Sequence, residues 1–191
     1  MRKIVFDIET RNIFSDVGKN DPTLLDISIV GIYDSNTNSY SSYAQEELSY
    51  LWPIIERADL LIGFNSNHFD IPLLNKYYPG NLLQIKSIDI METIKNALGR
   101  RLSLANVAGT TLNLKKSADG LQAVQWWKEG KIDEIRKYCI HDVKVTKDLY
   151  DHILSTKKIK YRDGTDIREL TLDTTNWESG SDHALTHTLG F

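Results

Sequence analysis

The chain has 191 residues, of which 41% are hydrophobic, and a formal net charge of −3 at pH 7. That length predicts one domain, spanning residues 1–191, with one sizeable core. The near balance of charge excludes a polycation that binds nucleic acid by charge alone. The single cysteine, Cys139, excludes an internal disulfide framework and is typical of a reducing compartment.

The sequence shows no pattern of a targeting or membrane-spanning segment. Met1, Arg2 and Lys3 precede a short apolar run that reaches acid at Asp7, which is too short and too polar for a signal peptide. No apolar run approaches the length that crosses a bilayer. We therefore expect a cytoplasmic protein without a membrane partner.

Hydrophobic periodicity predicts an alternation of strands and helices. The first three strands read as an antiparallel meander, because turn residues separate them. Pro53 within the first helical pattern warns of a kink. The apolar run 59–65 is typical of a central strand covered on both faces, and its last residues, 65–67, are expected to cap the next helix. Strands are expected at 2–10, 25–33, 39–43, 59–65 and 85–90. Helices are expected at 46–58, 91–98, 118–128 and 132–154, together with one that follows residues 65–67 and ends at about 78 and a short one that begins at 103.

This order of elements predicts a mixed-sheet α/β domain. Its core would cover about residues 1–155. The remainder, about 156–191, reads as a hairpin that pairs residues 159–161 with 170–172, followed by a polar tail.

Two carboxylates lie inside the apolar opening strand. Because side chains alternate across a strand, Asp7 and Glu9 point to one side while Ile4, Phe6 and Ile8 fill the other. Two like charges on one half-buried patch are costly unless a cation neutralises them. Mg²⁺ and Mn²⁺ seek oxygen ligands, so a divalent cation is the natural partner of this pair.

A third carboxylate, Asp70, directly follows the buried strand in the first turns of the next helix. Strand ends and helix starts in α/β sheets are where ligands gather. Taken alone, this position favours a simpler role, in which Asp70 complements the helix dipole.

A fourth carboxylate interrupts the apolar stripe of the long helix. Tyr138 and Asp142 lie one turn apart on the face that also carries Ile135, Val145 and Leu149. An unpaired buried aspartate would be strongly penalised, so a partner for Asp142 is expected.

Together these residues form three motifs, each weak alone, in a specific order. In that order the chain resembles the DEDD exonuclease superfamily, and within it the tyrosine-bearing (DEDDy) branch, over roughly residues 4–150. It looks most like the exonuclease domain of family-B DNA polymerases and related stand-alone exonucleases. The histidine-bearing branch would have histidine where this chain has Lys137. The motifs are a D-x-E strand (Asp7, Glu9), an N-x3-F-D junction (Asn65, Phe69, Asp70) and a helical Y-x3-D (Tyr138, Asp142).

The resemblance implies an RNase H-like (DnaQ-like) mixed sheet flanked by helices, and a 3′–5′ exonuclease that releases nucleoside monophosphates from single-stranded ends, with DNA favoured. It implies two divalent cations, Mg²⁺ or Mn²⁺, with Asp7 bridging them. Glu9 and Asp142 would complete the water-bearing site, and Asp70 would hold the second ion. The Tyr138 hydroxyl would orient the attacking water, because an ordinary phenol is a poor base at neutral pH.

Substrate contacts are also implied by the resemblance. Thr10 and Asn65 match family positions that touch the 3′-terminal nucleotide, and Phe69 would pack a base or simply the core, with the core favoured. Two alternatives stay open: a 3′–5′ exoribonuclease, and a catalytically silent module that keeps the fold to bind nucleic acid or a partner. A polymerase or helicase in trans is a further candidate partner.

Other polar and aromatic residues favour structural roles. Asp89 and Glu92 read as a capping box, and Ser103 as a helix N-cap. Trp126 and Trp127 are expected to pin two helices together.

The remaining basic residues, the histidine pair and the cysteine give little indication of a functional site. Most exposed basic pairs are only solvated, which we also expect for Arg100–Arg101 and Lys115–Lys116. His183 and His187 read as an incidental pair, and Cys139 shows no sign of activation.

Overall fold

The first strand, β1 (Lys3–Thr10), lies in the middle of a five-stranded mixed sheet with the order β3-β2-β1-β4-β5. A computed structural model of the protein describes residues 1–114 and 120–179, so Lys115, Lys116, His183 and His187 lie outside the described residues. The other strands are β2 (Ile27–Asp34), β3 (Ser39–Ala44), β4 (Leu60–Gly63), β5 (Ser87–Asp89) and the separate hairpin β6 (Lys158–Asp163) and β7 (Asp166–Thr171). The helices are α1 (Phe14–Val17), α2 (Leu48–Ile55), α3 (Asp70–Asn75), α4 (Ile90–Leu98), α5 (Leu104–Thr111), α6 (Gly120–Lys128) and α7 (Ile132–Thr156).

The sheet joins an antiparallel half to a parallel half at β1. β1 pairs antiparallel with β2, which pairs antiparallel with β3, so the meander expected from the sequence is confirmed. On its other side β1 runs parallel to β4, and β4 runs parallel to β5. The carboxyl ends of β1, β4 and β5 therefore lie at the same end of the sheet, where ligands of α/β proteins gather.

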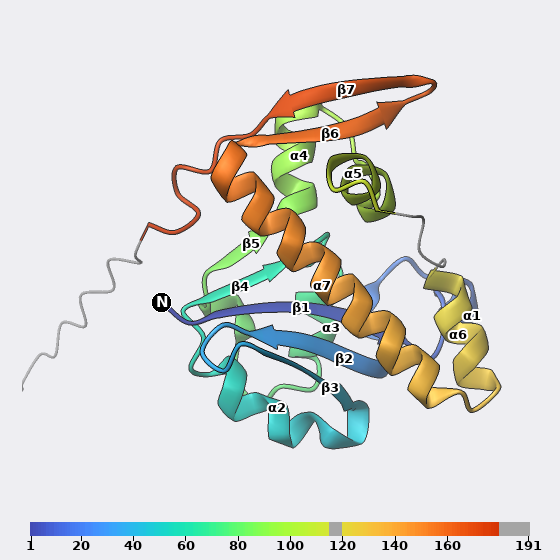
Figure 1. Cartoon of the computed structure of the whole chain (residues 1–191). Coiled ribbons are helices and arrows are strands. Elements are labelled where there is room, and N and C mark those ends of the chain that lie inside the picture. Colours follow the sequence, from blue (N-terminus) through green and yellow to red (C-terminus); the bar gives the residue numbers. More distant parts are fainter. Residues whose placement is uncertain (115–119, 180–191) are drawn as a thin grey trace, which may run out of the picture.

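Helices cover both faces of the sheet, with the long helix α7 lying across one of them (Figure 1). Ile4, Phe6 and Ile8 of β1 pack into a buried cluster that includes residues of α2 and α3. Val5, from the opposite face, belongs to the cluster that contains α7 residues. The alternation predicted for the opening strand is thus confirmed, and the odd-numbered positions face α7.

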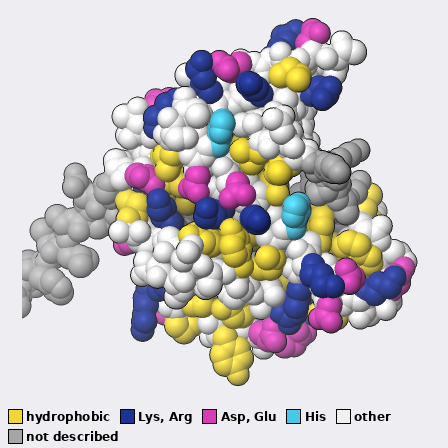
Figure 2. All heavy atoms as spheres, in the orientation of Figure 1, with side chains coloured by type: hydrophobic (Ala, Val, Ile, Leu, Met, Phe, Trp, Pro, Cys, Tyr) yellow, Lys and Arg dark blue, Asp and Glu magenta, His cyan; other side chains and the backbone are white. Residues whose placement is uncertain are grey.

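The face of the molecule seen over α7 carries a mixture of charges. Lys and Arg side chains alternate with Asp and Glu side chains across the middle of this face, without a large area of one sign (Figure 2). Within the described part of the chain, no helix combines the length and the apolar character needed to cross a membrane.

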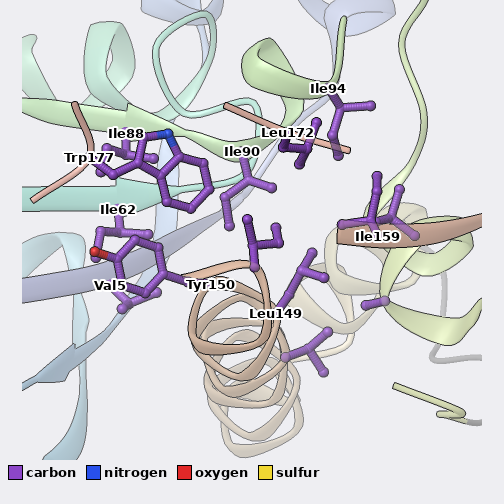
Figure 3. Packing of buried hydrophobic residues seen from close by; sticks show 14 of the residues in the cluster. Val5, Ile62, Ile88, Ile90, Ile94, Leu149, Tyr150, Ile159, Leu172 and Trp177 are labelled. Atoms are coloured by element: carbon purple, nitrogen blue, oxygen red, sulfur yellow. The ribbon is translucent and has the colours of Figure 1, made fainter. Parts of the chain in front are cut away.

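The carboxyl-terminal part of α7 packs on β1, β4 and β5 and also on the hairpin (Figure 3). Tyr150 stacks on Trp177 with ring centroids 5.3 Å apart and planes 3° apart. Ile159 of β6 and Leu172, just after β7, are buried in the same cluster. The hairpin expected near the C-terminus is present, but residues 159–161 pair with 168–170, and β7 begins earlier than predicted and ends before Leu172.

The junction after β4 differs from the expected capped helix. Asn65 has a left-handed backbone with φ 66°, and its carbonyl accepts hydrogen bonds from the N–H groups of His68 and Phe69. Helix α3 begins only at Asp70, without a side-chain cap. The prediction that residues 65–67 cap the helix is therefore wrong, because this segment closes a turn of its own.

Gly31 of β2 allows α7 to approach the sheet closely. A Cβ atom built at Gly31 would lie 2.8 Å from the Cys139 Sγ and 3.1 Å from the Val143 Cγ2. Both α7 residues are fully buried, so they have little room to move away. A glycine here thus sets the distance between the sheet and the helix that carries Tyr138 and Asp142.

We expect Gly31→Ala to lower the free energy of unfolding by about 1–3 kcal/mol, because it overpacks this contact. Gly109→Ala is the matched control: a Cβ there meets only the Leu114 carbonyl oxygen at an ordinary 3.6 Å, inside helix α5. The control should be stabilising by up to about 1 kcal/mol. Urea denaturation measures both, and equal effects of the two variants would contradict the close approach.

Candidate active site

Three carboxylates from two distant segments meet beside the sheet. Asp7 and Glu9 come from β1 and Asp142 from α7, and one oxygen of each lies within 4.8 Å of the others. Glu9 is buried and the other two are partly buried. Such a group of oxygen donors fits a hard divalent cation, which commonly binds through carboxylates.

The charges of this cluster repel one another in a setting of low polarity. Burial raises the pKa of Asp7 well above its ordinary value, and the charges of Glu9, Asp70 and Asp142 raise it further. The pKa of Glu9 is raised for the same reasons, with burial as the largest cause and Asp142 next. Burial also raises the pKa of Asp142, which a hydrogen bond from Tyr138 partly offsets. The cluster therefore needs protons or cations at neutral pH.

Asp70 lies next to this cluster, although it is not one of the three that come within 4.8 Å. It is the first residue of α3 and is 5% exposed. Burial and the charge of Asp89 raise the pKa of Asp70 to about 7, while backbone N–H groups, including that of Ile8, partly stabilise its charged form. The hydrogen bond from Ile8 ties Asp70 to β1 between Asp7 and Glu9.

Tyr138 completes the group from α7. Its hydroxyl donates a hydrogen bond to the Asp142 carboxylate, one helical turn away. Burial and the charges of Asp142 and Glu9 raise the pKa of Tyr138 above its ordinary value. The phenol therefore keeps its proton at neutral pH, so it can donate or orient a hydrogen bond but cannot act as a base.

Cys139 lies directly behind Asp7. It is fully buried, and its Sγ lies 3.3 Å from the Asp7 backbone oxygen and 3.6 Å from Asp7 Oδ2. Burial and the nearby acids raise the pKa of the thiol well above its usual range. The neutral S–H is thus a weak donor that holds Asp7 in place, consistent with the expected lack of activation.

Asp89 holds the turn that leads to Asp70, a role that its sequence position did not reveal. One carboxylate oxygen accepts from the N–H groups of Asn65 (2.8 Å) and Glu92 (3.1 Å). The other accepts from the Asn67 N–H at 3.0 Å. The predicted N-cap of α4 is confirmed, but the Glu92 side chain accepts from the Asn67 side chain at 2.7 Å. Asp89 therefore joins two segments instead of capping one helix only.

A pocket of about 540 Å³ opens beside Glu9 and Asp142. Its size lies within the range of small-molecule sites. Two of its wall residues, Leu121 and Val124, come from α6 and were not predicted from the sequence. The pocket is lined by Ile8, Glu9, Thr10, Asn12, Ile13, Phe14, Ser15, Leu25, Phe69, Leu121, Val124, Tyr138 and Asp142.

Of the three residues expected to touch substrate, Thr10 and Phe69 line the pocket and Asn65 does not. Thr10 lines the pocket, and its hydroxyl donates to the Asn12 carbonyl at 2.8 Å. Phe69 also lines it while packing edge-to-face on Phe14, at 6.0 Å between ring centroids. Asn65 is not one of the lining residues; its buried Oδ1 lacks a partner among the described residues.

Residues expected to be structural pack as the sequence indicated. Trp126 packs edge-to-face on Tyr138, at 6.0 Å between ring centroids, and thereby joins α6 to α7. Trp127 lies under the Arg11 guanidinium at 4.3 Å. The Ser103 side chain caps α5 as expected. Arg100 differs from the expectation of a solvated side chain, because it pairs with Asp163.

Comparisons with known proteins agree with this architecture. The model of a family described as the RNase_H superfamily matches residues 4–154. A search of curated proteins finds no match. The structure is similar to that of the family B DNA polymerase from the hyperthermophilic archaeon Pyrobaculum calidifontis, with a TM-score of 0.62 and 17% identity over 81% of this chain. The chain spans only 24% of that polymerase, and likeness at this identity concerns the fold. The expected RNase H-like fold is confirmed.

The cluster predicts an unusual dependence of stability on pH. Because the pKa of Asp70 is about 7 when folded and about 3.9 when unfolded, the folded state holds more protons between those values. In chelator, the thermal midpoint should therefore fall as pH rises from about 5 to 8. Thermal unfolding followed by circular dichroism measures this, and subtracting the curve of Asp70→Asn isolates the contribution of Asp70. Identical slopes for the two proteins would contradict the assignment.

Two aspartates of the site should differ in their effect on stability. Asp89→Ala should lower the free energy of unfolding in chelator by about 3 kcal/mol, because three backbone N–H groups lose a charged acceptor. Asp142→Ala should leave it unchanged or raise it, because repulsion within the cluster decreases. Urea denaturation distinguishes them. A large loss of stability in Asp142→Ala would argue against the repulsive cluster.

Proposed function

The chain belongs to the RNase_H superfamily, and on that basis we propose that it is a metal-dependent 3′–5′ exonuclease acting on single-stranded ends. The observation that carries this proposal is the cluster of Asp7, Glu9 and Asp142, of which Glu9 and Asp142 line a pocket of about 540 Å³. A phosphodiester carries negative charge, so four bare carboxylates would repel it. Cations bound by these carboxylates remove that conflict.

The residues fit a site for divalent cations. Asp7, Glu9 and Asp142 would hold the cations, with Asp70 as a further ligand from the adjacent helix. When bound, Mg²⁺ or Mn²⁺ supplies an activated water and stabilises charge on the leaving oxygen. The raised pKa values of the four acids agree with this role, because a cation would replace the protons that the cluster holds.

The protein's own residues would position the reacting groups. Tyr138, a neutral phenol bonded to Asp142, would orient the attacking water. The Ile8 N–H and the Cys139 thiol hold Asp70 and Asp7 in place. Held in this way, the acids need little rearrangement when substrate arrives, which is the usual source of electrostatic catalysis.

The pocket supports cleavage at an end of a strand. Its walls combine apolar side chains such as Leu121, Val124 and Phe69 with the polar Thr10 and Glu9, as a site for one nucleoside would require. The 3′ polarity and the preference for DNA are proposals that come from the motifs of the tyrosine-bearing branch. The likeness to a family B DNA polymerase is compatible with them.

The experiment is a gel of single-stranded DNA and RNA, each labelled at the 5′ or 3′ end, with Mg²⁺, Mn²⁺ or chelator. We expect metal-dependent shortening of 5′-labelled DNA one nucleotide at a time. Asp142→Ala should lower the rate by more than about 100-fold, because loss of an outer-shell partner alone costs 10–100-fold.

Asp148→Ala is the matched control, because Asp148 lies on the same helix with its side chain 43% exposed. It should keep the native rate. Faster cleavage of RNA would favour the exoribonuclease. If the native protein cleaves neither polymer, the proposed exonuclease activity is refuted and a catalytically silent binding module is favoured.

A further inference from the structure

Two adjacent residues of the turn after β4 face two different cavities. Phe69 lines the pocket beside the carboxylates, whereas His68 lines a second cavity of about 230 Å³. Asp89, at the carboxyl end of β5, contributes to the second cavity, and its charge acts on Asp70. We call this cavity the β5 pocket; it is lined by Asn67, His68, Asp89, Met91, Glu92, Lys95 and Arg101.

The acidic side chains of the β5 pocket are hydrogen-bonded within the described part of the chain, whereas its lysine and arginine side chains are not. Asp89 accepts three backbone N–H groups, and Glu92 accepts from the Asn67 side chain. In contrast, the exposed side chains of Lys95 and Arg101 make no hydrogen bond or ion pair within residues 1–114 and 120–179. Lys147, which lines another cavity, is by contrast paired with Asp151. The pocket therefore offers two uncommitted positive charges and the imidazole of His68.

We propose that the β5 pocket binds a backbone phosphate of the nucleic-acid strand whose end lies at the carboxylates. This inference rests on the proposed function. Lys and Arg contacts to phosphate supply much of the affinity for nucleic acid, without regard to sequence. An acidic chain with a carboxylate centre needs such contacts locally, because its net charge of −3 gives no general attraction.

The proposal distinguishes long substrates from short ones. In this proposal, a strand that ends at Glu9 and Asp142 passes over the turn at His68 and Phe69, whose side chains line the two cavities, to reach Lys95 and Arg101. A small phosphodiester, such as the p-nitrophenyl ester of thymidine 5′-monophosphate, has no second phosphate to place there. Replacing Lys95 or Arg101 should therefore weaken the binding and cleavage of oligonucleotides and leave the cleavage of the small ester unchanged.

The test compares Lys95→Gln and Arg101→Gln with Arg57→Gln. Arg57 is an exposed basic residue between α2 and β4. It lies at the amino end of β4, whereas the β5 pocket lies at the carboxyl ends of the strands. Binding of a fluorescent single-stranded oligothymidylate is measured in chelator over a range of salt. Each pocket variant should bind several-fold more weakly, and the slope of log affinity against log salt should shrink by about 0.7. Arg57→Gln should match the native protein.

Kinetics with Mn²⁺ provide the second readout. The value of kcat/KM should fall several-fold for the oligothymidylate and stay unchanged for the small ester. Pocket variants that match Arg57→Gln in binding would overturn the proposal, as would equal losses on both substrates. If the native protein cleaves neither substrate but binds the strand, the proposed function fails and the salt slopes still decide the pocket. If it binds no strand either in chelator or with Mn²⁺, both fail.

Discussion

Mutual repulsion among buried and partly buried carboxylates is the constraint around which this protein is organised. Asp7, Glu9 and Asp142 lie within 4.8 Å of one another, and Asp70 adds its charge from the adjacent helix. In an environment of low polarity this arrangement opposes folding unless protons or cations neutralise it. A protein keeps such a cost where the charges do chemistry, so the cluster is the strongest pointer to function in the chain.

The fold holds this cluster by close packing on one side and hydrogen bonding on the other. Gly31 lets α7 approach the sheet, which brings Asp142 to Asp7 and places Cys139 directly against it. Asp89 fixes the turn after β4 through three backbone N–H groups, and α3 then begins at Asp70. The same turn separates the two pockets, so one small segment positions Asp70 and shapes both cavities.

Local patterns predict the strands and helices, whereas the expectation that the acids of β1 and α7 meet comes from the resemblance to the exonuclease superfamily. Alternation in β1 placed Asp7 and Glu9 on one side, and helical spacing placed Tyr138 near Asp142. The roles of Asp89 and α6 could not be predicted, because they depend on contacts between segments far apart in the chain. Asp89 looked like an ordinary N-cap, and only the fold brings Asn65 and Asn67 to its carboxylate. The sequence does not distinguish a cap from a turn at Asn65, because Asn favours both helix caps and left-handed turns.

Anomalous X-ray scattering from a crystal soaked in Mn²⁺ near pH 8 shows whether these acids hold divalent cations. We expect an anomalous peak at coordinating distance from Asp7, Glu9 and Asp142. A well-ordered crystal without any peak among these three side chains would contradict it.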